Sequence, residues 1–489
     1  MLPAGIHIRH PDKLYIDGQW VDALSRGSAG IVCPNSEEVV ARVAMAGHED
    51  MDRAVEAART AFDRGPWPRT APAERGRMVR ALADRLRARS EELQKAWIAQ
   101  IGGLPGMAVG VVANGHRILA EIAALGDEFP WVEERRGTAV DTAMIVREPV
   151  GVVAAIAPWN APYMIMCGKI GYALISGSTV IMKPAPETPL EAYIIAEEAD
   201  ALGFPPGVIN LVPSDRDAAD HLVNHVAVDK VSFTGSTLAG ARIAEVCGRR
   251  IARYSLELGG KSAAIIRDDF PIDEAARILG STITRLSGQI CAMLTRAIVP
   301  RGRHDALADA IARHMKGVKI GHSMDEGVEL GPLAMQRQLA RVESYIEEGR
   351  RTADLVTGGR RPSHLNKGYF MEPTLFANVD NRSRIAQEEI FGPVLCLIPA
   401  DDEEDAIRIA NESHYGLHGS VFTRDAGAAY RIARQVRTGT VSQNGLRTEP
   451  GMPFGGFKQS GIVREGGQEG LWPYIETKTI LLDQAPGPM

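Results

Sequence analysis

Apolar residues recur at helical spacing through the first third of the chain. Between residues 49 and 65 they fall three or four positions apart, at Met51, Ala54, Val55, Ala58 and Phe62. Pro72 opens a second segment of this kind, and Ser90, which two glutamates follow, is typical of the capped start of a third. This part of the chain therefore predicts amphipathic helices that each bury one face against a core.

At about Arg147 the pattern changes to short apolar runs separated by helical stretches. VGVVAAIAP, STVIMKP, GVINLVP and DKVSFTG are rich in Val and Ile and end in Gly, Pro or polar residues, as strands do. A second alternating series runs from about Gly260 to Ser442. Alternation of strands and helices implies parallel strands joined by right-handed crossovers. We therefore expect an α/β protein with two such units, in which a doubly wound sheet forms the first.

Two further segments alternate apolar and polar residues. They are DTAMIVREPV, which precedes the first sheet, and YIETKTILL, near the end of the chain. Strands of this kind leave open edges unless they pair with each other or with a partner chain. We interpret them as an oligomerisation element, with a local hairpin as the alternative.

Length, charge and cysteine usage limit the possible classes of protein. A chain of 489 residues is too long for one ordinary core, which indicates two or three domains. The net charge of −6 and the absence of a basic block argue against nucleic-acid binding. We see no signal-peptide pattern and no uninterrupted apolar stretch of the roughly 18 residues that span a bilayer. The five cysteines include no CxxC pair, so we expect a cytoplasmic protein without disulfides and without a metal site.

A glycine turn between a strand and a helix is a candidate phosphate site. VSF runs into Gly235 and Ser236 and then into a helix, so unpaired N–H groups and the positive end of the helix dipole face outward. Most such turns bind nothing, and the GxGxxG fingerprint is absent. Lys183 ends the strand STVIM, where ligands of open α/β sheets bind, and from there it can reach ribose hydroxyls. An ordinary solvated lysine is the alternative.

Three more residues are candidates for catalysis. Cys291, in SGQIC, is either a nucleophile or a buried structural thiol. It falls near the end of a predicted helical segment. Glu257 ends an apolar strand ahead of two glycines, as a solvated strand end or as a general base whose pKa burial raises. Asn160 lies between prolines just past a strand, where a rigid amide donor can stabilise an oxyanion.

Taken together, these motifs resemble the aldehyde dehydrogenase superfamily over nearly the whole chain. The resemblance rests on REPVGVVAAIAPWNAP, KPAPETPL, FTGSTLAG, ELGGKS, SGQIC, EEIFGPV and PFGGFKQSG. It implies an NAD(P)-dependent enzyme of the hydrolytic branch, which oxidises an aldehyde to a carboxylic acid. Cys291 would carry a thioester, Asn160 and the Cys291 N–H would hold the oxyanion, and Glu257 would activate the hydrolytic water.

The resemblance also implies roles for other residues. Lys169 and Glu476 match a pair that helps to move protons away from the general base. Cofactor contacts are implied for Trp159, Lys183, Glu187, Gly235, Ser236, Gly240, Leu258, Glu389 and Phe391. An aldehyde pocket is implied at Ala161, Ile165, Gly168, Ile290, Ala292 and Phe454.

The sequence departs from the family pattern at several positions. Pro186 stands where many NAD-preferring members carry a glutamate, and Glu187 lies beside it. We therefore expect NAD as the cofactor, with NADP possible. Ala161 and Gly168 are small where bulky aromatic residues are common, which predicts a roomy entrance for an aromatic or branched aldehyde. Val463 replaces the glycine of the usual SGxGRE pattern.

The resemblance also predicts a division into domains. A Rossmann-like NAD(P)-binding domain would comprise 1–127 and 150–258, and a second α/β catalytic domain 259–445. A returning loop or helix would follow at 446–473, with a small β oligomerisation arm at 128–149 and 474–489 that builds a homodimer or homotetramer.

Two alternatives stay open. A CoA-acylating relative would typically lack the counterpart of Glu257. A catalytically silent structural relative would have no reason to keep Cys291, Glu257, Asn160 and Lys183 together.

Overall fold

Two large sheets organise the chain in the computed structural model, which describes residues 2–486. The first sheet has the order β19-β11-β10-β7-β8-β9-β1-β2. Its strands are β1 (Leu14–Ile16), β2 (Gln19–Val21), β7 (Val152–Ile156), β8 (Thr179–Lys183), β9 (Ile209–Leu211), β10 (Lys230–Thr234), β11 (Arg253–Glu257) and β19 (Gly461–Ile462). The five strands β7 to β11 pair in parallel, which confirms the expected doubly wound arrangement.

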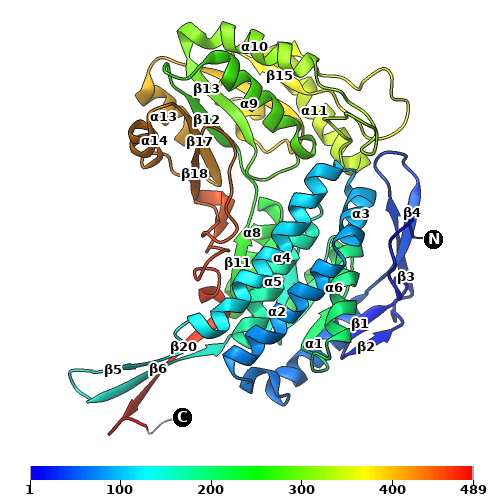
Figure 1. Ribbon diagram of the computed structural model, residues 1–489, viewed down its shortest axis with the longest axis vertical. Helices are drawn as coiled ribbons and strands as arrows, with labels where there is room; N and C mark the ends of the chain where they lie inside the picture. Colours follow the sequence, from blue (N-terminus) through cyan, green and yellow to red (C-terminus); the bar gives the residue numbers. More distant parts are fainter. Residues whose placement is uncertain (1, 487–489) are drawn as a thin grey trace.

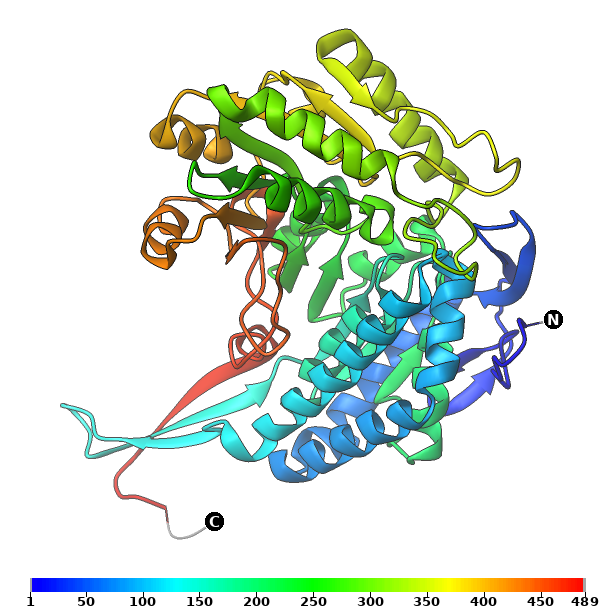
Figure 2. The same cartoon turned by 45° about the horizontal axis from the view of Figure 1, so that its top comes forward.

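Helices cover both faces of this sheet (Figures 1 and 2). One face carries α2 (Pro72–Ala88), α3 (Ser90–Ile101), α4 (Pro105–Glu128), α5 (Pro162–Ser176) and α6 (Leu190–Ala201), and the other carries α1 (His48–Asp63), α7 (Arg216–Asn224) and α8 (Thr237–Arg250). Val153 and Ala155 of β7 pack with the first group, and Val152 and Ala154 with the second. Because both faces are buried, the strand has no polar side and its sequence is a continuous apolar run.

The second sheet has the order β14-β15-β16-β13-β12-β17-β18. Its strands are β12 (Ser262–Ile266), β13 (Leu294–Pro300), β14 (Asp354–Thr357), β15 (Thr374–Ala377), β16 (Val394–Ala400), β17 (His418–Phe422) and β18 (Thr440–Gln443). One face packs α9 (Ile272–Thr284) and α10 (His304–Lys316), and the other packs α11 (Gln336–Thr352), α12 (Arg384–Gln387), α13 (Glu403–Asn411) and α14 (Ala426–Ala433). Only the edge strand β14 pairs antiparallel within the residues described, so this sheet is the second α/β unit that the sequence predicts.

The two alternating segments pair with each other. β20 (Ile475–Leu482) runs antiparallel to β6 (Thr142–Pro149), from Ile475 opposite Pro149 to Leu482 opposite Thr142, and β5 (Val132–Arg135) completes the sheet. Figures 1 and 2 show these three strands projecting away from the body of the protein. Leu481 of β20 is exposed. An oligomerisation role for this arm stays a prediction.

The sequence analysis missed the strands in the first 45 residues. β1 pairs antiparallel with β9 and so extends the first sheet, while β3 (Gly27–Val32) and β4 (Val39–Met45) form a separate hairpin. β1 and β2 have three residues each, too few to establish a period of two. Five short 3-10 turns complete the chain: η1 (Trp67–Arg69), η2 (Arg285–Gly288), η3 (Arg301–Arg303), η4 (Lys458–Ser460) and η5 (Trp472–Tyr474).

Helix α4 is apolar enough to need an explanation. Among the residues described it is the one helix whose length and hydropathy would allow it to cross a membrane, so the expectation that no stretch reaches that length was too strict. Half of its most apolar window is buried inside the protein, with Leu119 and Ile122 in the core beside α2 and α5. Core packing accounts for its composition, because a buried helix has no polar face.

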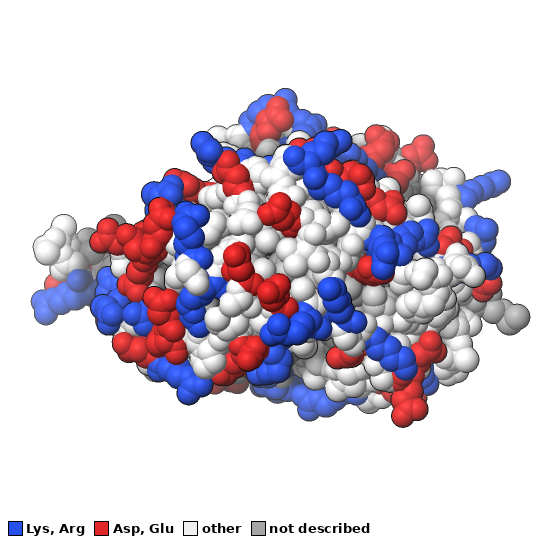
Figure 3. Space-filling model, turned by 90° about the horizontal axis from the view of Figure 1, so that it is seen from above, with Lys and Arg blue, Asp and Glu red and all other residues white. Residues whose placement is uncertain are grey.

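Acidic and basic side chains are interspersed over the molecular face seen in Figure 3.

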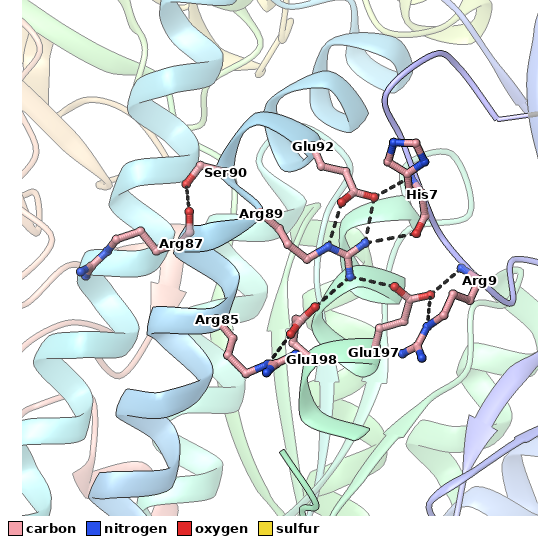
Figure 4. Close-up of polar contacts among 9 residues, drawn as sticks. All are labelled: His7, Arg9, Arg85, Arg87, Arg89, Ser90, Glu92, Glu197 and Glu198. Atoms are coloured by element: carbon pink, nitrogen blue, oxygen red, sulfur yellow. Dashed lines mark hydrogen bonds and ion pairs between the residues drawn. The ribbon is translucent and has the colours of Figure 1, made fainter. Parts of the chain in front are cut away.

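A cluster of charged side chains fixes the N-terminal segment to the helices (Figure 4). The Arg89 guanidinium donates to Glu92 and Glu197 at 2.8 Å each, and to Glu198 at 3.0 Å. Glu92 in turn accepts from the N–H of His7, and Glu197 from that of Arg9, at 2.6 Å each. Burial lowers the pKa of Arg89, but hydrogen bonds to Glu92 and Glu197 outweigh burial and raise it.

Ser90 does not cap α3, contrary to the sequence prediction. The N-cap residue is Arg89, without a side-chain cap hydrogen bond. The Ser90 hydroxyl instead donates to the Arg87 carbonyl at 2.6 Å (Figure 4). The preceding helix α2 ends at Ala88, one residue before this N-cap, so the hydroxyl binds a carbonyl of α2 that the end of that helix leaves free.

Replacing Arg89 with Met is expected to destabilise the protein by about 3 kcal/mol, because the buried charge of Glu197 would keep only the more distant Arg9 guanidinium, at 3.7 Å. Urea unfolding and the protection of residues 6–9 from hydrogen exchange would measure this loss. Arg87→Met is the matched control, since Arg87 is exposed and its pair with Asp84 at 3.5 Å contributes roughly 0.5 kcal/mol or less. Equal midpoints for the two variants would contradict a stabilising role of the cluster.

Candidate active site

Four neighbouring strands of the first sheet end at the same edge. β8, β7, β10 and β11 are adjacent and parallel, and Lys183, Asn160, Ser236 and Glu257 lie at or just beyond their carboxyl ends. The strand order reverses at β7, since β8 continues on one side and β10 on the other. Ligands of open α/β sheets bind beyond such a reversal. The residues selected from the sequence therefore converge at the place where the fold forms a crevice.

The second sheet approaches this edge with the amino ends of its strands. Cys291 precedes β13 and Glu389 precedes β16, while Gly259 and Gly260 lie in the connection from β11 to β12. A Cβ atom on Gly260 would lie 2.5 Å from the Cys291 carbonyl oxygen, and one on Gly259 would lie 2.5 Å from Glu389 Oε2. Both contacts are too close for any side chain. The two glycines of ELGGKS thus allow the two units to meet around the thiol.

Cys291 lies in a tight loop rather than on a helix, which corrects the sequence interpretation. Helix α9 ends at Thr284, and Leu286, Ser287 and Gly288 follow with positive φ angles of 48°, 53° and 76°. The Ser287 hydroxyl lies 2.8 Å from the Gly331 carbonyl. This left-handed stretch is strained for non-glycine residues, and it turns the chain so that Cys291 faces the sheet edge.

The Asn160 amide lies beside the loop that leads to Cys291. Its Nδ2 donates to the Gln289 carbonyl at 2.9 Å, two residues before Cys291, and the side chain is buried. An amide nitrogen carries two hydrogens, so the second one is free to donate to an oxygen bound at Cys291. The indole of Trp97 donates to the Asn160 carbonyl at 3.2 Å and fixes this turn.

Glu257 is a buried carboxylate without a hydrogen-bond partner. It is 4% exposed, and neither of its oxygens has a partner within residues 2–486. Burial raises its pKa well above the ordinary value and the charge of Glu465 adds to this, while Lys169 and Arg464 act in the opposite direction. A Cβ atom on Gly455 would lie 2.6 Å from Glu257 Oε1, so a glycine is needed for this approach. A carboxyl held in this way binds a proton more readily than an exposed one, as a general base has to.

The thiol of Cys291 is half-buried, and its surroundings disfavour ionisation. Burial and the nearby carboxylates of Glu389 and Glu257 raise its pKa to about 12, although the N–H groups of Ala292 and Cys291 favour the thiolate. At neutral pH the thiol of the free protein is therefore protonated. A base, or a bound cation, has to assist its ionisation before it can attack a carbonyl.

The sequence-based partner of Lys169 was wrong. Lys169 is fully buried, and its Nζ binds Glu465 Oε1 at 2.7 Å. Glu476 lies on β20, where its half-exposed side chain pairs with Arg253 at 2.5 Å. Glu465 reaches the site because its backbone exchanges two hydrogen bonds with Phe454, at 2.6 and 2.8 Å. The motif SGIVRE contained this glutamate, but nothing in the sequence indicated which carboxylate folds against Lys169.

The expected phosphate site has the local geometry to bind an anion. Ser236 is the N-cap of α8, and its hydroxyl oxygen accepts from Ala239 N at 3.3 Å, so its hydrogen is free to donate outward. A Cβ atom on Gly240 would lie 2.6 Å from Leu258, so this glycine allows α8 to pack close to β11. Lys183 is buried at the end of β8, and burial lowers its pKa to about 8, against the charges of Glu187 and Asp215.

The other residues predicted to contact the cofactor surround the same crevice. The rings of Trp159 and Phe391 meet edge to face, 5.3 Å apart. Phe391 has a φ of 60°, and its carbonyl accepts from Gln338 at 2.7 Å. Glu389 accepts from the Gly260 N–H at 3.1 Å, and burial raises its pKa to about 7. Glu187 pairs with Arg337 at 2.5 Å at the outer end of the crevice.

The residues predicted to form the aldehyde pocket lie on two sides of the thiol. Ala161 is the N-cap of α5, and Ile165 and Gly168 follow on that helix. Ile290 and Ala292 flank Cys291, and Ile290 packs in a cluster with Met107 and Val111 of α4 and with Trp159. Phe454 lies in the loop that delivers Glu465. An aldehyde pocket formed by these residues would lie between α4, α5 and the loop that holds Cys291.

The histidines of the first unit include one candidate pair of metal ligands. His221 and His225 are spaced as a helical ligand pair, which the sequence analysis overlooked, and their Nε2 atoms lie 2.6 and 3.7 Å from one oxygen of Asp52. Within residues 2–486, however, no group of three or more His, Cys, Asp or Glu side chains is arranged to hold a metal ion.

Comparison with known proteins identifies the family of this chain. Residues 20–480 match the profile of the aldehyde dehydrogenase family. Geranial dehydrogenase of Castellaniella defragrans is 42% identical over 471 residues, which cover 96% of this chain and 98% of that protein.

Two solved structures are similar over the whole fold. The aldehyde dehydrogenase of Mycobacterium tuberculosis in complex with NAD+ has a TM-score of 0.93 and 40% identity, covering 96% of this chain and 98% of that one. Betaine aldehyde dehydrogenase of Staphylococcus aureus in complex with NAD+ has a TM-score of 0.95 and 35% identity, covering 98% and 96%. Given these matches and the site described above, this chain belongs to the aldehyde dehydrogenase family.

Proposed function

We propose that this protein oxidises apolar aldehydes to carboxylic acids with NAD, through a thioester on Cys291 that water hydrolyses with the help of Glu257. One observation carries the proposal. Glu257 is a buried, unpartnered carboxylate, close enough to Cys291 that its charge raises the pKa of the thiol. A structural carboxylate would be paired or exposed, whereas a general base has to stay free.

The first half of the reaction uses Cys291 and Asn160. The thiolate adds to the aldehyde carbon, and the carbonyl oxygen becomes an alkoxide. The free hydrogen of the Asn160 amide and the Cys291 N–H stabilise this oxyanion. Bound NAD supplies the acceptor for the hydride that leaves the carbon, which converts the adduct to a thioester. The crevice fits this cofactor, with the end of α8 for the pyrophosphate, Lys183 and Glu389 for ribose hydroxyls, and Trp159 and Phe391 beside the nicotinamide.

The second half uses Glu257. Its carboxylate takes a proton from water, and the hydroxide attacks the thioester carbonyl. The C–S bond then breaks, which releases the acid and regenerates the Cys291 thiolate. Glu465 and Lys169, joined at 2.7 Å, lie next to Glu257 and can accept or balance the proton that it gains.

Substitutions at the three reacting positions test this mechanism. Cys291→Ala should abolish turnover, Asn160→Ala should lower it about 10²–10³-fold, and Glu257→Gln about 10²–10⁴-fold. Glu257→Gln should still give one rapid burst of reduced cofactor, because only hydrolysis is blocked. Absorbance of the reduced cofactor after rapid mixing with hexanal, without CoA, measures all three. Near-wild-type turnover in the Asn160 and Glu257 variants would refute the assignment, and a strict need for CoA would indicate an acylating enzyme.

The shape of the pocket supports a long or branched apolar aldehyde. A Cβ atom on Gly168 would have one near neighbour within 4 Å, Ile118 Cγ2 at 3.8 Å, so there is room for a methyl group beside α5. Ile118 also borders a cleft of about 460 Å³ that runs between α4 and the loop at 450–453. From Val111 to Ile118, α4 rises about 10 Å, which is close to the length of an eight-carbon chain. The similarity to a geranial dehydrogenase agrees with a substrate of this kind.

Filling the space at Gly168 should change which aldehydes are oxidised. Gly168→Phe is expected to lower kcat/KM for geranial at least tenfold and to leave that for propanal within about twofold, because the ring occupies the volume of the tail. Gly168→Ala is the matched control, since its methyl group makes an ordinary contact. A wild-type preference for short, charged aldehydes such as betaine aldehyde would overturn this assignment.

NAD is the proposed cofactor, supported by the NAD+ complexes of the related structures. The carboxylate of Glu187 would disfavour the 2′-phosphate of NADP, although Arg337 partly neutralises it. Glu187→Gln should raise the ratio of kcat/KM for NADP over NAD by about fivefold, because a partly exposed charge contributes about 1 kcal/mol. Glu347→Gln, at an exposed position on α11, should leave the ratio unchanged. If Glu187→Gln also left it unchanged, Glu187 would have no part in the selection.

The remaining sequence predictions belong to this proposal. They are cofactor binding by 1–127 and 150–258, catalysis by 259–445, a homodimer or homotetramer joined through the arm, and a cytoplasmic location. The exposed Leu481 supports an interface at the arm, since an apolar strand edge in water favours association.

A further inference from the structure

Two lysines lie buried inside the first unit, on opposite sides of one tyrosine. Lys169 of α5 and Lys230 of β10 are both fully buried, and Tyr474, at the end of η5, is 1% exposed. Lysine is almost never fully buried unless a partner compensates its charge. Only Lys169 has a role in the mechanism proposed above, so Lys230 and Tyr474 need an explanation.

Ser232 joins Lys169 to Tyr474. Lys169 Nζ lies 3.2 Å from Ser232 Oγ and 2.7 Å from Glu465 Oε1, so the ammonium group lies between a hydroxyl and a carboxylate. The Tyr474 hydroxyl donates to the same Ser232 oxygen at 2.8 Å. Ser232 Oγ is therefore fixed from the side opposite Lys169. Its position sets where the ammonium group can sit.

Lys230 fixes Tyr474 in turn. Its Nζ lies 4.6 Å from the centroid of the Tyr474 ring, within the range of a cation–π contact, and donates to Ser255 Oγ at 2.5 Å. Tyr172 also stacks on the Tyr474 ring, with centroids 5.9 Å apart. Both contacts help to fix the position of the ring. We call Tyr474, Ser232, Lys169 and Lys230 the Tyr474 cluster.

The charges around the cluster explain why its geometry matters to the reaction. Glu257 is buried and Glu465 is partly buried beside it, and Lys169 favours the ionised form of Glu257. Other titratable or charged groups face the cluster and the carboxyl pair: Arg464, Cys291, Tyr172, Cys247 and Arg253. Burial lowers the pKa of Lys230 to about 7, and the charge of Lys169 adds to this. Lys169 is thus the cation that directly contacts the carboxyl pair, and its distance from Glu465 affects the basicity of Glu257.

We infer that Tyr474 and Lys230 are positioning residues for the hydrolytic step: through Ser232 they hold the Lys169 ammonium against Glu465, where its charge favours the ionised form of Glu257 that takes a proton from water. The inference rests on the proposed thioester mechanism. It assigns no proton transfer to Tyr474, which donates to Ser232 and receives nothing from it. It predicts an effect on deacylation and none on acylation.

The acyl-enzyme of 4-nitrophenyl acetate separates these two steps. Attack by Cys291 on the ester releases 4-nitrophenolate and leaves an acetyl thioester, so absorbance reports acylation. Mass spectrometry of the desalted, NAD-loaded protein then follows the loss of the acetyl group. Tyr474→Phe keeps the ring and removes only the hydroxyl, and Lys230→Met keeps most of the side-chain volume.

Both variants should acylate at the wild-type rate and lose the acetyl group more slowly. For Tyr474→Phe we expect deacylation to slow about tenfold at pH 7, because a rise of about one unit in the pKa of Glu257 lowers the fraction of ionised base about tenfold below that pKa. If Lys169 is displaced, the pKa of Glu257 rises. The acid limb of the pH–rate profile for deacylation should therefore move to higher pH by about one unit. At pH values above the shifted limb, the deacylation rate should return to that of the wild type. Lys230→Met should act in the same direction with a smaller shift.

Tyr193→Phe is the matched control, because this buried tyrosine of α6 stacks on Trp20 and its hydroxyl has no hydrogen-bond partner within residues 2–486. It should leave both rates and the pH profile unchanged. An unaltered profile in Tyr474→Phe, or a loss of rate that is equal at every pH, would overturn the inference and leave the thioester mechanism intact. Failure of the wild-type protein to acylate at Cys291 would remove the mechanism and the inference together.

Discussion

The parallel pairing of β7, β8, β10 and β11 is the constraint on which the whole site depends. Parallel strands end at one edge, so groups that are far apart in the sequence arrive side by side without any contact of their own. Thr234 lies opposite Glu257, and Ile156 lies opposite Lys183. A shift of one residue in this register would turn Glu257 to the opposite face of the sheet. The apolar cores on both faces fix the register, and in doing so they fix the general base.

The positions of the charged side chains inside the first unit follow from the same parallel sheet. α5 packs on the face of the sheet where Lys169 meets Ser232, and the loop after β19 returns Glu465 to them. A buried ion pair gains little net stability, because desolvation offsets the attraction between its charges. The Lys169–Glu465 pair is therefore better explained by its electrostatic effect on Glu257 than by a contribution to folding. The N-terminal cluster around Arg89 differs, since it joins three separate segments and lies away from the site.

Local sequence signals predicted what depends on local geometry. The strand ends at Glu257 and Lys183, the turn at Gly235 and the strand character of the two arm segments all follow from alternation and turn chemistry. The prediction failed where a contact joins distant parts of the chain. Lys169 and Glu465 are separated by 296 positions, and no local pattern distinguishes Glu465 from Glu476.

The same limit explains other differences between sequence and structure. Ser90 has the right residue type for a cap, but its hydroxyl binds a carbonyl at the end of the preceding helix. Strands β1 and β2 exist because β9 offers an edge to pair with, and their own three residues carry too little pattern. The small residue at position 168 could be read from the sequence, whereas its contact with Ile118, which borders a cleft, required the structure.

Two strained loops are in contact: the loop before Cys291 and the loop that holds Phe391, where the cofactor is proposed to bind. The loop before Cys291 holds three consecutive residues with positive φ, and Phe391 adopts a φ of 60° on the facing loop. A Cβ atom on Gly288 would lie 2.1 Å from the Gly392 carbonyl oxygen, so the two strained loops are in direct contact. Each non-glycine residue with a positive φ costs about 1–3 kcal/mol. It keeps this conformation only where the surrounding structure enforces it. Neither loop can relax without moving the other, and ligand contacts at Phe391 therefore bear on the position of the Cys291 thiol.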